Sequence, residues 1–132
     1  MVFYDFEHKN ILSLASEETL QLACVKYLRK CEDSLFSCNG IADTLDTDDK
    51  RINAYNLGYL KGCPDLIIYL SNDKYYLLCI EFKNCYGSGV LSKEQNIVLE
   101  RLEKDCKAFC CVINSLEAFV EIYIKYVNNL LN

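Results

Sequence analysis

The sequence predicts an α/β domain in which helices pack against a central β-sheet. Segments with the 3.6-residue spacing of amphipathic helices alternate along the chain with short apolar runs of strand length. The predicted order is helix, β-hairpin, helix, strand, helix (α-β-β-α-β-α), without internal repeats or low-complexity tracts. Because 132 residues is an ordinary length for one compact unit, we expect a single domain over residues 1–132.

The first predicted helix covers residues 16–31. Ser16 suits an N-cap position, the acidic Glu17 and Glu18 follow it, and apolar residues then recur at helical spacing. Residues 38–62 are polar, rich in Asp and Asn and without a clean period, so the sequence predicts a long connection there. Connections of this kind often carry functional residues.

The β-hairpin is predicted over residues 65–82. Two runs rich in Ile, Leu and Tyr are separated by a Ser-Asn-Asp-Lys turn at residues 71–74. A capping box formed by Ser92 and Gln95 then opens an amphipathic helix that should end near Asp105. Residues 108–114 form a strand-length apolar run, and Ser115 opens the closing helix.

Composition limits the classes of function. A net charge of −5 argues against a protein that coats nucleic acid through bulk positive charge, although an acidic metal site in a nuclease remains compatible with it. No apolar run is long enough to span a bilayer and the first ten residues lack signal-peptide features, so we expect an intracellular protein. The nine cysteines are odd in number and contain no C-x-x-C pair, which favours reduced, buried thiols over a zinc site.

The strongest chemical pattern is a pair of carboxylates beside a lysine. Side chains alternate along a strand, so Glu81 and Lys83 should share one face, and Asp65 can lie close to them in an antiparallel hairpin. Two converging carboxylates suit Mg²⁺, and a lysine can position an attacking water or stabilise charge on a phosphodiester. The alternative is a surface ion pair with Asp65 as a turn residue. The apolar neighbours Leu78 and Ile80 favour a site.

Three motifs in order resemble a known family. They are GYLKGCPDL at residues 58–66, Glu81-Phe82-Lys83, and LSKEQ at residues 91–95. Together they resemble the virus-type replication-repair nuclease (VRR-NUC) module of the PD-(D/E)xK superfamily. The similarity extends to further positions upstream and downstream: Glu17, Gln21, Asn39-Gly40, Arg51, residues 115–118 and Tyr126.

The resemblance implies a restriction-endonuclease-like core, with a mixed central sheet flanked by helices, that cleaves DNA with Mg²⁺ or Mn²⁺. The implied metal ligands are Asp65, Glu81 and the backbone carbonyl of Phe82. Glu18 competes with Glu17 as the helix-one acid. The implied catalytic set is Glu17, Asp65, Glu81, Lys83 and Gln95.

Small stand-alone members of this group tend to act as homodimers on branched DNA. The resemblance therefore implies a structure-selective endonuclease that resolves Holliday junctions in replication or repair. Separately, the abundance of Asn, Lys, Ile and Tyr with a single Pro indicates an AT-rich viral or parasitic genome. Restriction-like cutting of duplex DNA and a non-cleaving nucleic-acid-binding module are the alternatives. Arg51, Lys61 and Lys93 are candidates for contacts to the DNA backbone, although such cations are by default only solvated. No membrane partner and no small-molecule cofactor are expected.

Overall fold

The computed structural model describes residues 3–5, 16–31, 34–39, 44–83 and 90–131. One five-stranded sheet has the order β1-β5-β4-β3-β2. Strand β5 runs parallel to its neighbours β1 and β4, whereas β3 runs antiparallel to its neighbours β2 and β4, so the mixed sheet implied by the family resemblance is confirmed. The elements in chain order are β1 (Phe3–Asp5), α1 (Glu17–Lys30), β2 (Phe36–Cys38), α2 (Asp48–Asn56), β3 (Leu66–Ile68), β4 (Leu77–Phe82), α3 (Lys93–Cys106), β5 (Ala108–Ile113) and α4 (Leu116–Val127).

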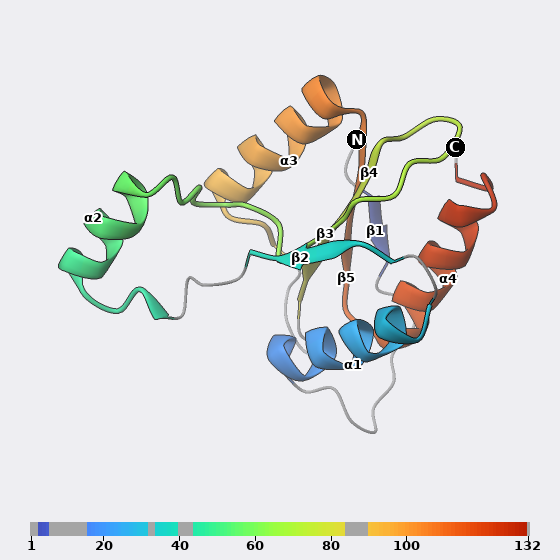
Figure 1. Ribbon diagram of the computed structural model, residues 1–132, viewed down its shortest axis with the longest axis horizontal. Helices are drawn as coiled ribbons and strands as arrows, with labels where there is room; N and C mark the ends of the chain where they lie inside the picture. Colours follow the sequence, from blue (N-terminus) through green and yellow to red (C-terminus); the bar gives the residue numbers. More distant parts are fainter. Residues whose placement is uncertain (1–2, 6–15, 32–33, 40–43, 84–89, 132) are drawn as a thin grey trace.

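Helices cover both faces of the sheet. Figure 1 shows α3 on one side and α1 with α4 on the other. Alternation along the strands divides the core accordingly: Ile80 and Cys111 pack in the cluster with α1 and α4, while Cys79 and Cys110 pack in the cluster that includes Leu99 of α3. The faces of β4 that carry Glu81 and Ile80 are therefore opposite, as the sequence predicts.

Helices α1 and α4 are joined by aromatic packing. Tyr27 of α1 lies edge-on to Phe119 and Tyr123 of α4, with ring centroids 6.2 Å and 5.9 Å apart. The N-cap of α1 is Ser16, whose Oγ accepts a hydrogen bond from Thr19 N at 3.0 Å, as expected from the sequence. This packing fixes α1 against the sheet, with its first turn on the side where β3 begins.

The prediction of a plain connection over residues 38–62 is wrong. The segment contains α2, which begins after the N-cap Thr47, and it is entered from β2. The helix is mostly polar and none of its residues is buried, so its few apolar positions are too sparse to mark a helix in the sequence. The short β1 and β2 were also missed, because three residues are too few to show a period of two. Strand β3 is shorter than expected, since the hairpin turn is closed by Asn72, whose Oδ1 accepts hydrogen bonds from Lys74 N and Tyr75 N.

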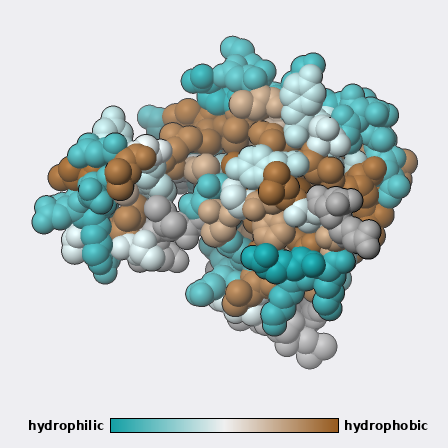
Figure 2. Space-filling view, viewed as in Figure 1, coloured by the Kyte–Doolittle hydropathy of each residue, from teal (hydrophilic) through white to brown (hydrophobic). Residues whose placement is uncertain are grey.

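Helix α2 projects away from the layered body of the protein (Figure 1). Figure 2 shows apolar side chains on the surface of this projecting part, and Ile52, Tyr55 and Leu57 are 59%, 76% and 81% exposed. Within the described segments, no helix combines the length and apolar character needed to cross a bilayer. No disulfide joins the cysteines that the structure describes.

Candidate active site

The carboxylate pair lies at one end of the sheet, where β3 begins and β4 ends. The antiparallel register pairs Leu66 with Ile80, and one step further it places Asp65 opposite Glu81. Phe82 N donates a hydrogen bond to Asp65 Oδ2 at 2.9 Å, which anchors the aspartate to the partner strand. The structure thus brings Asp65 beside the Glu81-Phe82-Lys83 segment, as the hairpin prediction requires.

Gln95 connects the glutamate to the lysine. Its Nε2 donates to Glu81 Oε1 at 2.6 Å, and its Oε1 accepts from Lys83 Nζ at 3.3 Å and from Ser92 N at 2.8 Å. Lys83 Nζ also lies 3.9 Å from Glu81 Oε1. The same glutamine completes the capping box of α3, because Gln95 N donates to Ser92 Oγ at 3.1 Å. The start of α3 is therefore part of the site, and Gln95 holds both charged side chains in place.

Gly62 sets the distance between Asp65 and α3. It has φ +89°, and a Cβ atom there would lie 2.5 Å from the carbonyl carbon of Glu94. Only glycine allows the loop before Asp65 to touch the backbone of the first α3 turn so closely. Lys61 Nζ adds an ion pair with Glu94 Oε1 at 3.5 Å. The docked loop brings Asp65, from one side, and Gln95, from the other, to the same end of the sheet.

Burial and mutual repulsion keep the carboxyl pair from being fully ionised. Glu81 is 2% exposed, and burial followed by the charge of Asp65 raises its pKa to about 8, although Lys83 opposes the change. Burial also raises the pKa of Asp65, against the hydrogen bond from Phe82 N, and the charge of Glu17 raises it further. Two such groups share a proton near neutral pH unless a cation replaces it.

The pair fits a divalent cation. Glu81 Oε2 is buried and accepts no hydrogen bond from the residues that the structure describes, so it offers an unused oxygen on the side chain that faces Asp65. No cluster of three His, Cys, Asp or Glu side chains suited to a metal occurs among the described residues. Mg²⁺ nevertheless keeps several waters and is commonly held by one or two carboxylates, with the Phe82 carbonyl next in the chain after Glu81.

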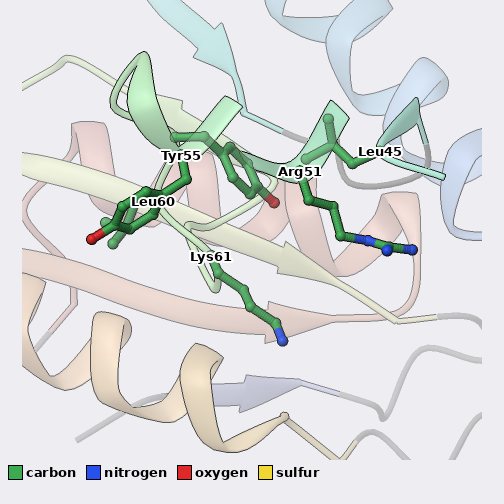
Figure 3. Close-up of a pocket in the computed structure, with 6 residues that line it drawn as sticks. Leu45, Arg51, Tyr55, Leu60 and Lys61 are labelled. Carbon is green, nitrogen blue, oxygen red and sulfur yellow. The ribbon is translucent and has the colours of Figure 1, made fainter. Parts of the chain in front are cut away.

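The remaining predicted residues are Glu17, Lys93, Arg51 and Lys61, which lie on the elements around the carboxylate pair. Glu17 is exposed on the first turn of α1, and of the two helix-one acids it is the one whose charge raises the pKa of Asp65. Lys93 is exposed at the start of α3. Arg51 and Lys61 line a hollow of about 480 Å³ together with tyrosines 55 and 59 (Figure 3). Arg51 Nη1 is paired with Asp48 Oδ1 at 2.8 Å, so it is not directed at the carboxylates.

Sequence reasoning overlooked the thiol next to the site. Cys63 is half-buried two residues before Asp65, and burial, then the charges of Glu81 and Asp65, raise its pKa. This thiol therefore stays protonated at neutral pH and does not act as a further anion. Its position within the GYLKGCPDL motif was the only available signal. A second overlooked contact joins α1 to β2, where Gln21 Nε2 donates to Cys38 Sγ at 3.1 Å.

Fold and site together define the class: an α/β domain with a carboxylate pair and a lysine at the end of a hairpin in a mixed sheet. A solved structure described as a VRR_NUC domain protein shares this fold with a TM-score of 0.66, covering 85% of this chain and 88% of that chain at 18% identity. That likeness confirms the fold implied by the sequence motifs. The sequence matches no protein-family model and no curated protein.

Proposed function

We propose that this protein is a divalent-metal-dependent endonuclease that hydrolyses phosphodiester bonds in branched DNA. The observation that carries the proposal is the connected set of Asp65, Glu81, Lys83 and Gln95 at the end of β4. A buried glutamate with an unused oxygen costs free energy in a purely structural role, whereas it is expected in a site that binds a cation.

Each side chain has a defined task in this proposal. Bound Mg²⁺ or Mn²⁺ supplies Lewis-acid stabilisation of a phosphoryl oxygen and lowers the pKa of water. Asp65 and Glu81 hold the ion. Lys83, which is 15% exposed and held by Gln95 Oε1, directs an ammonium donor to the attacking water or to the charge that develops on the phosphate. Glu17 is the acid available from α1 to orient water.

The surroundings suit an anionic backbone in spite of the negative net charge. Helices α1 and α3 both begin on the side of the molecule where β3 begins (Figure 1), so the positive ends of two helix dipoles are directed to this region. Lys93 adds a cation in the first turn of α3. Lys61 and Arg51 add two more at the hollow beside α2 that they both line. We assign these three side chains to contacts with phosphates that flank the cleaved bond.

A homodimer is the second part of the proposal, and the projecting α2 supports it. Ile52, Tyr55 and Leu57 expose apolar surface on a helix that buries none of its own residues. Lys50 pairs with Asp46 and Arg51 with Asp48, so acidic neighbours offset the charges of both α2 cations, and the exposed apolar side chains need a partner other than DNA. A second copy of the chain is therefore the occupant we assign to the apolar side of the arm. Two-fold symmetry would place two sites on symmetric phosphates of a junction.

The oligomeric state is tested by light scattering at micromolar concentration. The native protein should have the mass of two chains, and Ile52→Asp should shift it towards one. Asn53→Asp is the matched control, because it adds the same charge at an exposed position of α2 without removing apolar surface. A native monomer, or equal behaviour of the two variants, would contradict the assignment.

The substrate is tested with labelled four-way junction, flap, duplex and single-stranded DNA in Mg²⁺ or Mn²⁺. We expect cleavage of the four-way junction, by paired and symmetric cuts, in preference to the other forms. Cutting of linear duplex at equal rate would replace junction resolution by restriction-like cleavage. Binding without cleavage of any form would replace the endonuclease by a nucleic-acid-binding module.

A further inference from the structure

A third polar side chain lies in the same row of the sheet as the carboxylate pair. Asn39 N donates a hydrogen bond to Asp65 O at 3.1 Å, which continues the register that pairs Cys38 with Leu66. Asp65 in turn lies opposite Glu81. Residues that pair directly across antiparallel strands point to the same face, so Asn39, Asp65 and Glu81 form one row with Asp65 in the middle.

The side-chain amide nitrogen of Asn39 is buried. Among the residues that the structure describes, this Nδ2 atom has no hydrogen-bond partner. Buried amide groups are normally hydrogen-bonded, and an unsatisfied donor next to a site is expected where a ligand completes it. The register therefore places an unused N–H donor beside Asp65, on the side away from Glu81.

The chemistry of the donor restricts what it can bind. An N–H group is repelled by a metal cation, so the Asn39 amide nitrogen is not a ligand of the ion assigned to Asp65 and Glu81. It fits an anionic oxygen. Lys83 supplies a donor at the Glu81 end of the row, and Asn39 supplies one at the other end, with the two carboxylates between them.

We propose that the Asn39 side chain donates a hydrogen bond to a non-bridging oxygen of the phosphate that is cleaved. This inference rests on the proposed endonuclease function and adds a residue that contacts the substrate. The phosphate would then face the ion that Asp65 and Glu81 would hold in the centre of the row, with a hydrogen-bond donor from the residue after β2 at its edge. Removal of a single donor of this kind lowers the rate of the chemical step by about 100-fold.

The test compares Asn39→Ala with the native protein and with Asn96→Ala, a matched control at an exposed position of α3. Single-turnover cleavage of junction DNA in Mn²⁺ should fall about 100-fold in Asn39→Ala and stay unchanged in Asn96→Ala. Two further readouts exclude a structural role. The melting temperature should not fall, because the deleted amide nitrogen has no partner among the described residues, and Mn²⁺ affinity measured by calorimetry without DNA should not change.

A substrate with one sulfur at the cleaved phosphate locates the contact. In one phosphorothioate diastereomer the sulfur replaces the oxygen that Asn39 contacts, and since sulfur accepts hydrogen bonds weakly, the loss caused by Asn39→Ala should shrink to less than about threefold. In the other diastereomer the full loss of about 100-fold should remain. Equal losses on both diastereomers, or a fall in melting temperature or Mn²⁺ affinity, would overturn the proposal.

The outcomes also separate this inference from the proposed function. Metal-dependent cutting by the native protein at a rate that Asn39→Ala leaves unchanged would remove Asn39 from the site while the endonuclease stands. If the native protein cuts no DNA, both proposals are overturned.

Discussion

Proton release accompanies metal binding if Asp65 and Glu81 are the ligands. The pKa of Glu81 is raised from 4.5 to about 8, chiefly by burial and next by the charge of Asp65. At neutral pH the metal-free site therefore retains a proton that a cation must displace. The perturbation we choose is pH between 6 and 9, combined with the substitution Glu81→Gln.

The size of the effect follows from the shift. One pKa unit corresponds to about 1.4 kcal/mol, so a rise from 4.5 to about 8 corresponds to at most about 5 kcal/mol between the two protonation states of Glu81. Below this pKa the apparent dissociation constant for the metal should rise about tenfold for each unit of pH lost. Because Glu81 is already half protonated at pH 8, binding at pH 6 should then be about 50-fold weaker than at pH 8.

The same shift has a consequence for stability without metal. Because the folded pKa is above the unfolded one, the contribution of the protonated Glu81 is fully present below pH 4.5 and is lost as pH rises through about 8. The melting temperature of the metal-free protein should therefore fall between pH 5 and 9. The neutral isostere in Glu81→Gln should remove much of this dependence, and added Mn²⁺ should stabilise the native protein most at high pH.

Calorimetry measures the central quantity directly. Mn²⁺ titrations at pH 7 in buffers of different ionisation enthalpy should report release of about one proton per ion. Glu94→Gln is a matched control, since Glu94 is on the surface side of α3 and not part of the carboxylate pair. Affinity that is independent of pH, with no proton released, would refute the assignment of Glu81 as a metal ligand.

Three further substitutions test how the site is built. Gly62→Ala forces a Cβ atom to 2.5 Å from the Glu94 backbone, so we expect the unfolding free energy to fall by about 2–4 kcal/mol and nearly all cleavage to be lost. The control Gly58→Ala, at φ +99° with nothing within 4 Å of the added Cβ, should cost only about 1–2 kcal/mol. Equal denaturation midpoints for the two variants would count against the docked loop. Gln95→Glu places a carboxylate where the amide now donates to Glu81. Because the added negative charge disfavours ionisation of Glu81, cleavage at pH 7 should fall at least about tenfold and recover at higher pH. An unchanged pH profile of cleavage would exclude the bridging role of Gln95. Phe119→Ala removes a fully buried ring and should cost about 3–5 kcal/mol by urea denaturation, and a cost below about 1 kcal/mol would contradict its place between α1 and α4.

Long periodic segments and the carboxylate pattern could be predicted from sequence. The helices at Glu17–Lys30 and Lys93–Cys106 differ from their predicted limits by about one residue, because each combines an N-cap serine with an apolar stripe. The approach of Asp65 to Glu81 followed from the two-residue alternation and the short polar turn. Local chemistry was sufficient in these cases.

Elements whose evidence lies in tertiary pairing could not be predicted. Strand β2 has three residues, and its partner β3 lies across the whole α2 segment, so its register is set by contacts that no local pattern encodes. Asn39 is in line with Asp65 only because of that register. For the same reason the contact between Gly62 and the backbone of Glu94 was hidden: the sequence shows a glycine in a loop, and the structure shows what it approaches.

The most direct test of the central claim is single-turnover cleavage of four-way junction DNA in Mn²⁺ by native protein, Asp65→Asn and Lys83→Ala, with the exposed Lys104→Ala as control. The account predicts metal-dependent cleavage by the native protein and the control, and a loss of at least about 100-fold in both site variants without a change in junction binding. Cleavage that survives both substitutions would contradict the assignment of this site.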